Sequence, residues 1–171
     1  MIKLVGAVLI IVATTLVGFE VSKRLSERPR QLRLLKSALQ SLEAEIMYGH
    51  TPLHEASRRL AAQLSKPIST FFDHFSKRLT HTETTVMEAW EGSLKEVWKT
   101  TALKGGEYEI MKQFGETLGR HDRISQQKQI RLTLAHLERE EADAHEKQAK
   151  YERMAKSLGF LSGLLLIILL M

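Results

Sequence analysis

Two apolar segments, one at each end of the chain, constrain this sequence more than any other feature. Residues 158–171 contain no charged side chain, and a second apolar run covers residues 4–19. A helix rises about 1.5 Å per residue and the hydrocarbon core of a bilayer is about 30 Å thick, so a membrane span needs about 20 apolar residues. Both runs are slightly shorter than a comfortable span.

Charged residues at the borders can extend both runs to the required length. Lys3, Glu20 and Lys156 lie at these borders, where their side chains can reach toward the headgroups. We therefore expect three parts, which are a transmembrane helix at residues 1–21, a helical domain at residues 22–157 and a transmembrane helix at residues 158–171. The N-terminal run could instead be a cleaved signal peptide, but no A-x-A cleavage site follows it. The C-terminal run could instead be a buried core helix, but it lacks the polar face of an amphipathic helix.

The basic residues near the two runs predict the orientation in the membrane. Lys3 is the one basic residue on the outer side of either run. The inner borders carry Lys23, Arg24, Arg28, Arg30, Arg33, Lys147, Lys150, Arg153 and Lys156. The central domain should therefore be cytoplasmic, with both termini on the opposite side. The chain has no cysteine, which excludes a disulfide framework, and its net charge of +5 comes without the basic, aromatic stripe of a nucleic-acid-binding protein.

Apolar residues recur at helical spacing from the start of the central segment. The first predicted helix has Pro29 in its first turn and ends at Gly49. A second helix is predicted to begin at Pro52, with Thr51 as its N-cap. The apolar faces of the two helices are formed by Leu32, Leu35, Leu39, Leu42 and Ile46, and by Leu53, Ala56, Leu60 and Leu64.

Three further helices follow before the last one. Pro67 opens a third helix with an aromatic face, and Thr85 with Glu88 reads as the capping box of a fourth, which carries Trp90. Gly105 and Gly106 are expected to form the clearest break in the domain. The fifth helix carries apolar residues at Ile110, Phe114 and Leu118 and should be closed by Gly119.

One long helix is predicted from Asp122 onward, because no Gly or Pro interrupts the sequence before Gly159. Such a helix would be on the order of 70 Å long and would continue from the domain into the bilayer. No alternating strand pattern is present. The sequence therefore predicts an all-α fold, a compact bundle of about six helices between two terminal transmembrane helices.

The long helix carries a regular apolar seam with steps of four and three residues, which is the spacing of a coiled coil. The seam comprises Ile130, Leu134, Leu137, Glu141, Ala144, Gln148, Tyr151, Ala155 and Leu158. Its upper part could pack on the first helix of the same domain while the lower part forms a solvated stalk. Alternatively, the seam could be shared with another chain in a homo-oligomer.

No catalytic or metal-binding pattern stands out. His50 and His54 have the spacing of two ligands on one helix face, but Gly49 and Pro52 place a helix boundary between them. The two adjacent Asp–His pairs of the chain point apart on a helix. The chain has no Gly-rich phosphate loop, no nucleophile elbow and no Cys nucleophile. We therefore expect no enzyme, no cofactor and no small-molecule substrate.

Small residues at helical spacing occur in both apolar ends. Gly159 and Gly163 lie on one face of the C-terminal run, and Thr14 and Gly18 form a looser pair in the N-terminal run. Small residues let helix backbones approach closely in lipid, where packing replaces the hydrophobic effect. These four residues are therefore candidates for helix packing in the membrane.

Several strings resemble the stage III sporulation protein AB family of endospore-forming bacteria. They cover residues 45–56, 114–119 and 158–166, together with Asp122 and Gln126. One departure is His121, where the family pattern leads us to expect Ser. The matching positions that we take as family motif residues are Glu45, Gly49, Pro52, Leu53, Ala56, Gly119 and Asp122.

The central domain is also similar to the cytoplasmic domain of the type II secretion platform protein F. In platform protein F, a sequence element that contains Glu, Gly, Leu and Ala begins the second helix. In this chain the corresponding residues are Glu45, Gly49, Leu53 and Ala56.

The resemblance implies a component of the channel complex between mother cell and forespore. The protein would sit in the outer forespore membrane, with its domain in the mother-cell cytoplasm. It would link a secretion-type ATPase, stage III sporulation protein AA, to the membrane components. Two alternatives remain, which are a membrane-bound signalling module with a ligand pocket and a structural protein that acts through self-assembly alone.

Overall fold

The structure of the chain is a computed structural model that describes residues 26–49, 51–81, 83–118 and 123–170, the last of these partly by backbone alone. Its helices run over residues 26–48, Leu53–Gln63 (α2), Ile68–Leu79 (α3), Val86–Val97 (α4), Gly105–Thr117 (α5) and Arg123–Leu170 (α6), and a 3-10 turn, η1, covers Trp98–Thr100. No strand occurs in these ranges. The predicted all-helical class is confirmed.

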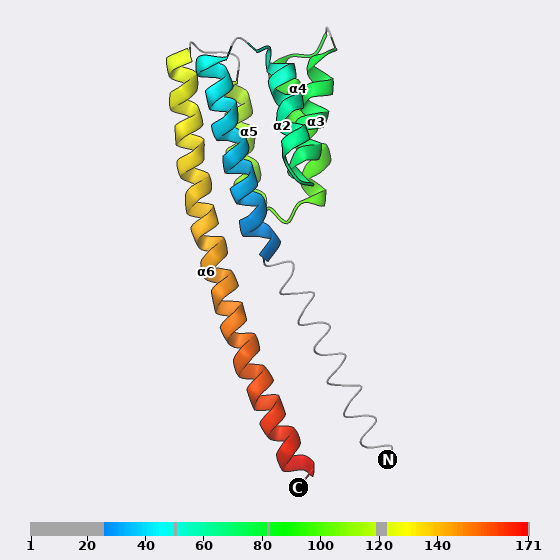
Figure 1. Ribbon diagram of the computed structural model, residues 1–171, viewed down its shortest axis with the longest axis vertical. Helices are drawn as coiled ribbons and strands as arrows, with labels where there is room; N and C mark the ends of the chain where they lie inside the picture. The colour runs from blue at the N-terminus through cyan, green and yellow to red at the C-terminus, as the bar shows by residue number, and fades with distance from the viewer. Residues whose placement is uncertain (1–25, 50, 82, 119–122, 171) are drawn as a thin grey trace.

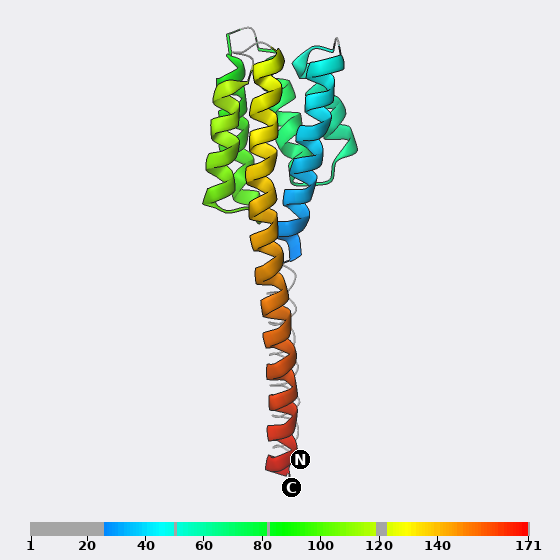
Figure 2. The same ribbon diagram turned by 90° about the vertical axis from the view of Figure 1, so that its left-hand side faces the viewer.

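The helices form one bundle from which α6 projects. Helix 26–48, α5 and the first half of α6 lie side by side, while α2, α3 and α4 form the other part of the bundle (Figures 1 and 2). Beyond the other helices α6 continues without a break toward the C-terminus (Figure 1). The prediction of a single long final helix is confirmed.

The core is built around Trp90 on α4. This side chain is fully buried, and its ring meets Phe71, Phe75 and Phe114 edge-on at centroid distances of 4.8, 4.9 and 5.2 Å. The indole Nε1 donates a hydrogen bond to the carbonyl oxygen of Met111 at 2.8 Å, so the ring's one polar atom is satisfied. This contact ties α3, α4 and α5 into one core.

Local signals predicted some helix ends correctly. Thr85 Oγ1 accepts the backbone N–H of Glu88 at 3.2 Å, and the Glu88 carboxylate accepts the N–H of Thr85 at 2.9 Å, which is the predicted capping box. Gly49 ends helix 26–48, where its N–H donates to the carbonyl of Glu45 at 2.9 Å. Pro67 is the N-cap residue of α3.

Other boundary predictions were wrong. Thr51 is not the N-cap of α2, because Pro52 takes that place and its carbonyl accepts the N–H groups of the first turn. Gly105 and Gly106 do not break the chain but begin α5, and the break lies before them, in η1 and the residues that follow it. Helix 26–48 also extends further toward the N-terminus than Pro29 indicated.

The seam of α6 changes character along its length. Ile130, Leu137 and Ala144 are buried in the domain core, whereas Tyr151 and Leu158 are 50% and 64% exposed. The upper part therefore packs within its own chain, as the first of the two interpretations predicted. None of the helices in the described ranges combines the length and hydropathy that a membrane crossing requires.

Candidate functional site: a charged junction of three helices

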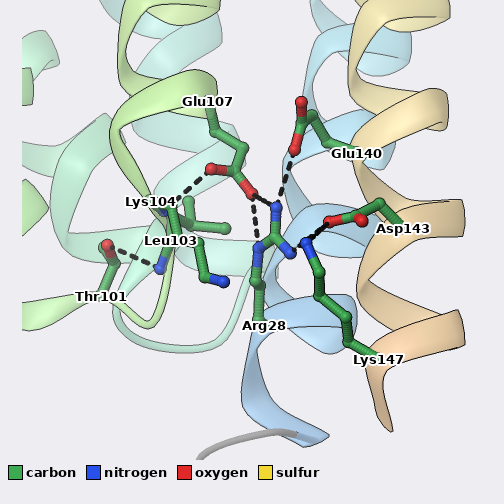
Figure 3. A network of polar contacts seen from close by, with 8 residues as sticks. All are labelled: Arg28, Thr101, Leu103, Lys104, Glu107, Glu140, Asp143 and Lys147. Carbon is green, nitrogen blue, oxygen red and sulfur yellow. Dashed lines mark hydrogen bonds and ion pairs between the residues drawn. The ribbon is translucent and has the colours of Figure 1, made fainter. Parts of the chain in front are cut away.

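A buried ion pair lies at the end of the bundle from which α6 projects (Figure 3). Arg28 Nε donates a hydrogen bond to Glu107 Oε1 at 2.7 Å, and the two side chains are only 8% and 0% exposed. The other guanidinium nitrogens reach α6, where Nη2 lies 2.7 Å from Glu140 Oε2 and Nη1 lies 3.0 Å from Asp143 Oδ2. One side chain of helix 26–48 thus binds α5 and α6 together. We call these four residues the Arg28 cluster.

The local structure of α5 places Glu107 in this cluster. Glu107 is the third residue of α5, and its Oε2 accepts the backbone N–H of Lys104 at 2.8 Å. A carboxylate in the first turn also interacts favourably with the helix dipole. Both oxygens of a fully buried carboxylate are therefore satisfied, one by a backbone amide and one by Arg28, which is the condition for burying a charge at tolerable cost.

The cluster favours the charged forms of Arg28 and Asp143. Burial lowers the pKa of Arg28, but its hydrogen bonds to Asp143 and Glu107 and the charges of Glu107 and Glu140 outweigh burial and raise it. The pKa of Asp143 is lowered, first by the hydrogen bond from Lys147 at 2.7 Å and then by that from Arg28. A cation with a raised pKa does not release a proton near neutral pH, so the cluster fastens helices together rather than transferring protons.

An open hollow of about 550 Å³ adjoins the cluster. Besides the four cluster residues, Lys104, His136, Arg139 and Lys147 line it. Its wall is mostly charged and carries both signs, which suits contact with charged groups of a protein better than an apolar ligand. Within the described ranges, no three His, Asp or Glu side chains are grouped so that they could hold a metal ion.

Further ion pairs join helix 26–48 to α6 above the cluster. Lys36 Nζ lies 2.9 Å from Glu141 Oε2, and Arg33 Nε lies 3.4 Å from Glu141 Oε1. Near the far end of the bundle Arg131 Nε lies 3.2 Å from Glu43 Oε1. Residues later in helix 26–48 pair with residues earlier in α6. The two helices are therefore antiparallel and in a fixed register.

These contacts predict a dependence of stability on pH. Burial raises the pKa of Glu141, but the hydrogen bond and charge of Lys36, with those of Arg33, outweigh it, so the folded pKa is below 4.5, and that of Asp143 is below 3.8. A lowered folded pKa contributes stability that is complete above the ordinary pKa and is lost as the pH falls through the folded value. We expect Glu141→Gln with Asp143→Asn to destabilise the protein near pH 6 and to destabilise it progressively less as the pH is lowered into the acid range, measured by chemical unfolding of both proteins at each pH.

The family motif residues form the connection between helix 26–48 and α2. Glu45 lies 3.8 Å from Arg59 on α2, and Gly49 is closely packed, since a Cβ there would lie 2.6 Å from the carbonyl oxygen of Glu45. Pro52 caps α2, Leu53 is its first residue, and Ala56 is buried. The motif therefore shapes a tight turn between two helices, and nothing in its geometry marks a ligand site.

The remaining predicted site residues are not described with their side chains. Thr14, Gly18, Gly119 and Asp122 lie outside the described residues. Gly159 and Gly163 lie in the part of α6 that is described by its backbone alone.

Sequence reasoning missed the Arg28 cluster. The sequence identifies Arg28 only as a basic residue near a membrane border, and it predicts Gly105 and Gly106 as a break between helices. One signal was available, because Glu107 stands three residues after Lys104, the spacing at which an acidic residue caps a helix start. Nothing local indicates that its partner is Arg28.

The comparisons with known proteins assign the chain to one family. The family model described as "Stage III sporulation protein AB (spore_III_AB)" matches residues 3–171. Stage III sporulation protein AB of Bacillus subtilis (strain 168) is 64% identical over 171 residues, which cover 100% of both chains. A solved structure of stage III sporulation protein AB (SpoIIIAB) is similar with a TM-score of 0.70 at 62% identity, over 72% of this chain and 98% of that one. The chain is thus a member of the stage III sporulation protein AB family.

Proposed function

We propose that this protein is a non-enzymatic, membrane-anchored platform component of a sporulation channel of the type II secretion kind. It attaches to the outer forespore membrane through residues 1–21 and 158–171. Its helical domain, residues 22–157, lies in the mother-cell cytoplasm, and both termini lie on the other side of the membrane. There it links a secretion-type ATPase, stage III sporulation protein AA, to the membrane components of the channel.

The position of the Arg28 cluster carries this proposal. The cluster joins Arg28, close to the N-terminal apolar run, to Glu140 and Asp143 on the helix that leads into the C-terminal run. Helix 26–48 and α6, the described helices nearest in sequence to the two apolar ends, are therefore fastened to each other and to α5 by a buried ion pair. A domain fastened in this way keeps a fixed orientation relative to its membrane anchors. A fixed orientation suits a protein that holds its binding partners in a defined arrangement.

The resemblance to the type II secretion platform protein F supports the ATPase as the cytoplasmic partner. The element that begins the second helix in platform protein F corresponds to residues that connect helix 26–48 and α2 here. Fold-level likeness is weak support for a specific partner on its own, so the partner has to be tested directly.

Charge reversal on α2 tests the adaptor function. Arg58 and Arg59 are exposed, with side chains 74% and 54% accessible, and their described ion pairs are partly exposed contacts with Glu55 and Glu45. Arg58→Glu with Arg59→Glu should change the free energy of unfolding by no more than about 1 kcal/mol, because surface ion pairs contribute little. We expect loss of sporulation and of ATPase co-purification, measured by spore counts and by mass spectrometry of detergent-solubilised complexes.

The matched control is charge reversal at two exposed lysines on the α4 side, Lys95→Glu with Lys99→Glu. If both double variants bind the ATPase as wild type does, α2 is not the interface. If wild-type protein retains the membrane components but never the ATPase, the adaptor function is wrong and self-assembly alone takes its place.

A further inference from the structure

The bundle exposes large apolar side chains at the end opposite the Arg28 cluster. Among the described residues outside the projecting part of α6, the exposed large apolar side chains are Tyr48 (82%), Ile124 (76%) and Leu132 (54%). Tyr48 is the last residue of helix 26–48, and Ile124 and Leu132 lie in the first turns of α6, drawn in yellow in Figure 1. Single exposed apolar residues are common, whereas a group of them at one end of a domain indicates a contact surface.

The register of the two helices brings Tyr48 to the level of Ile124. Glu43 accepts hydrogen bonds from Gln127 at 2.9 Å and from Arg131 at 3.2 Å. It therefore lies level with the turn between these two residues, at about residue 129 of α6. The helices are antiparallel and rise equally per residue, so Tyr48, five residues after Glu43, lies level with about residue 124.

The same part of α6 is basic. Ile124, Lys128 and Leu132 are exposed and follow one another at steps of four, so they form one ridge on the helix. Residues 123–137 contain no Asp or Glu, whereas five carboxylates occur in residues 138–146. An apolar ridge with a cation at its middle is complementary to an apolar surface that carries carboxylates. We call Tyr48, Ile124, Lys128 and Leu132 the distal face.

We propose that the distal face is a docking surface for a protein partner whose contacting surface is apolar and acidic. Tyr48, Ile124 and Leu132 supply the apolar centre of the contact, and Lys128 supplies the charge that orients it. A polyanion without apolar groups would leave the two aliphatic side chains exposed, so the chemistry of the ridge favours a protein.

The distance from the proposed membrane excludes the bilayer as the occupant. The rise of α6 from Leu132 to residue 158, where the C-terminal apolar run begins, is about 39 Å. The headgroup layer adds only a few ångströms to the hydrocarbon core, so the distal face lies well clear of it. This step rests on the proposed function, under which the partner on the cytoplasmic side is the ATPase.

The distal face lies next to the basic residues of α2. Arg59 Nη1 is 3.8 Å from Glu45 Oε1, and Glu45 precedes Tyr48 by three residues, which makes the two neighbours on helix 26–48. One partner can therefore contact the basic residues of α2 and the ridge of α6 together.

Binding of purified stage III sporulation protein AA to the detergent-solubilised full-length chain tests the distal face. Ile124→Ser with Leu132→Ser removes the apolar ridge from two exposed positions, so the thermal unfolding midpoint should not change. We expect the Kd to rise at least tenfold, and spore counts to fall in cells whose sole copy carries both substitutions. Lys128→Glu should weaken binding more at low than at high salt, because salt screens its charge.

The matched control is Ala142→Ser with Glu146→Ser, two exposed positions further along the same helix. It introduces the same residue type into α6 and should bind and sporulate as wild type does. Normal spore counts with a folded ridge variant would contradict the docking surface, whether or not the ATPase binds. If wild-type protein does not bind the ATPase but the ridge variant alone loses sporulation, the proposed ATPase partner is wrong and the distal face serves another protein.

Discussion

Arg28→Met is expected to lower the free energy of unfolding by about 3–5 kcal/mol, because it leaves the buried carboxylate of Glu107 without its cation. Glu107 is fully buried, and the N–H of Lys104 alone would then compensate its charge. Chemical unfolding of the full-length protein in detergent, followed by the helical circular dichroism signal, measures this loss. Adding Glu107→Leu should recover most of it, since replacing both members of a buried pair by apolar residues is often neutral.

Arg30→Met is the matched control for this experiment. Arg30 lies two residues further along the same helix, is 55% exposed and pairs with the neighbouring Glu27. Its loss should cost less than about 1 kcal/mol, as is usual for exposed ion pairs. If Arg28→Met costs no more than Arg30→Met, the cluster does not fasten the domain, and the adaptor proposal loses the observation that carries it.

The helical framework was predictable because its signals are local. The apolar spacing of helix 26–48, the Thr85–Glu88 capping box and the uninterrupted stretch that became α6 each involve residues within a few turns of one another. Periodicity of this kind reports directly on which face of a helix is buried. The seam of α6 is the clearest case, since its upper part is buried at Ile130 and Leu137.

The charged junction was not predictable, for a physical reason. Arg28 and Glu107 are 79 residues apart in sequence, and each stands in a stretch whose charges look like an ordinary solvated surface. Only the packing of helix 26–48 against α5 and α6 removes them from water. The predicted break at Gly105 and Gly106 was wrong for a related reason. The cap that Glu107 provides lets two glycines begin a helix, although glycine has a low helix propensity.

Gly115, in the core, is another residue whose role could not be predicted from the sequence. In sequence it is one glycine inside a predicted helix, where glycine usually costs stability. In the structure it faces Trp90, and a Cβ at Gly115 would clash with the indole ring, 2.8 Å from Nε1 and closer still to Cδ1. The size of a residue on α4 therefore dictates the absence of a side chain on α5.

Substitutions at Trp90 and Gly115 should have large and strongly coupled effects. Trp90→Ala removes the ring at the centre of the aromatic core and its hydrogen bond to Met111, which should cost about 3–5 kcal/mol. Gly115→Ala should cost at least about 1–3 kcal/mol, because the rigid ring cannot move aside in a core that other aromatic rings surround. Both are measured by chemical unfolding of the full-length protein in detergent.

The double variant distinguishes this explanation from a general intolerance of α5 to substitution. Once Trp90 is alanine, the added methyl group at Gly115 occupies space that the indole has left, so the second substitution should become nearly neutral. The coupling free energy should then be about 1–3 kcal/mol. Gly105→Ala on the same helix has open space around its Cβ and should be neutral or stabilising by up to about 1 kcal/mol. Additive losses at Trp90 and Gly115 would mean that the two residues act independently and that the clash does not explain the glycine.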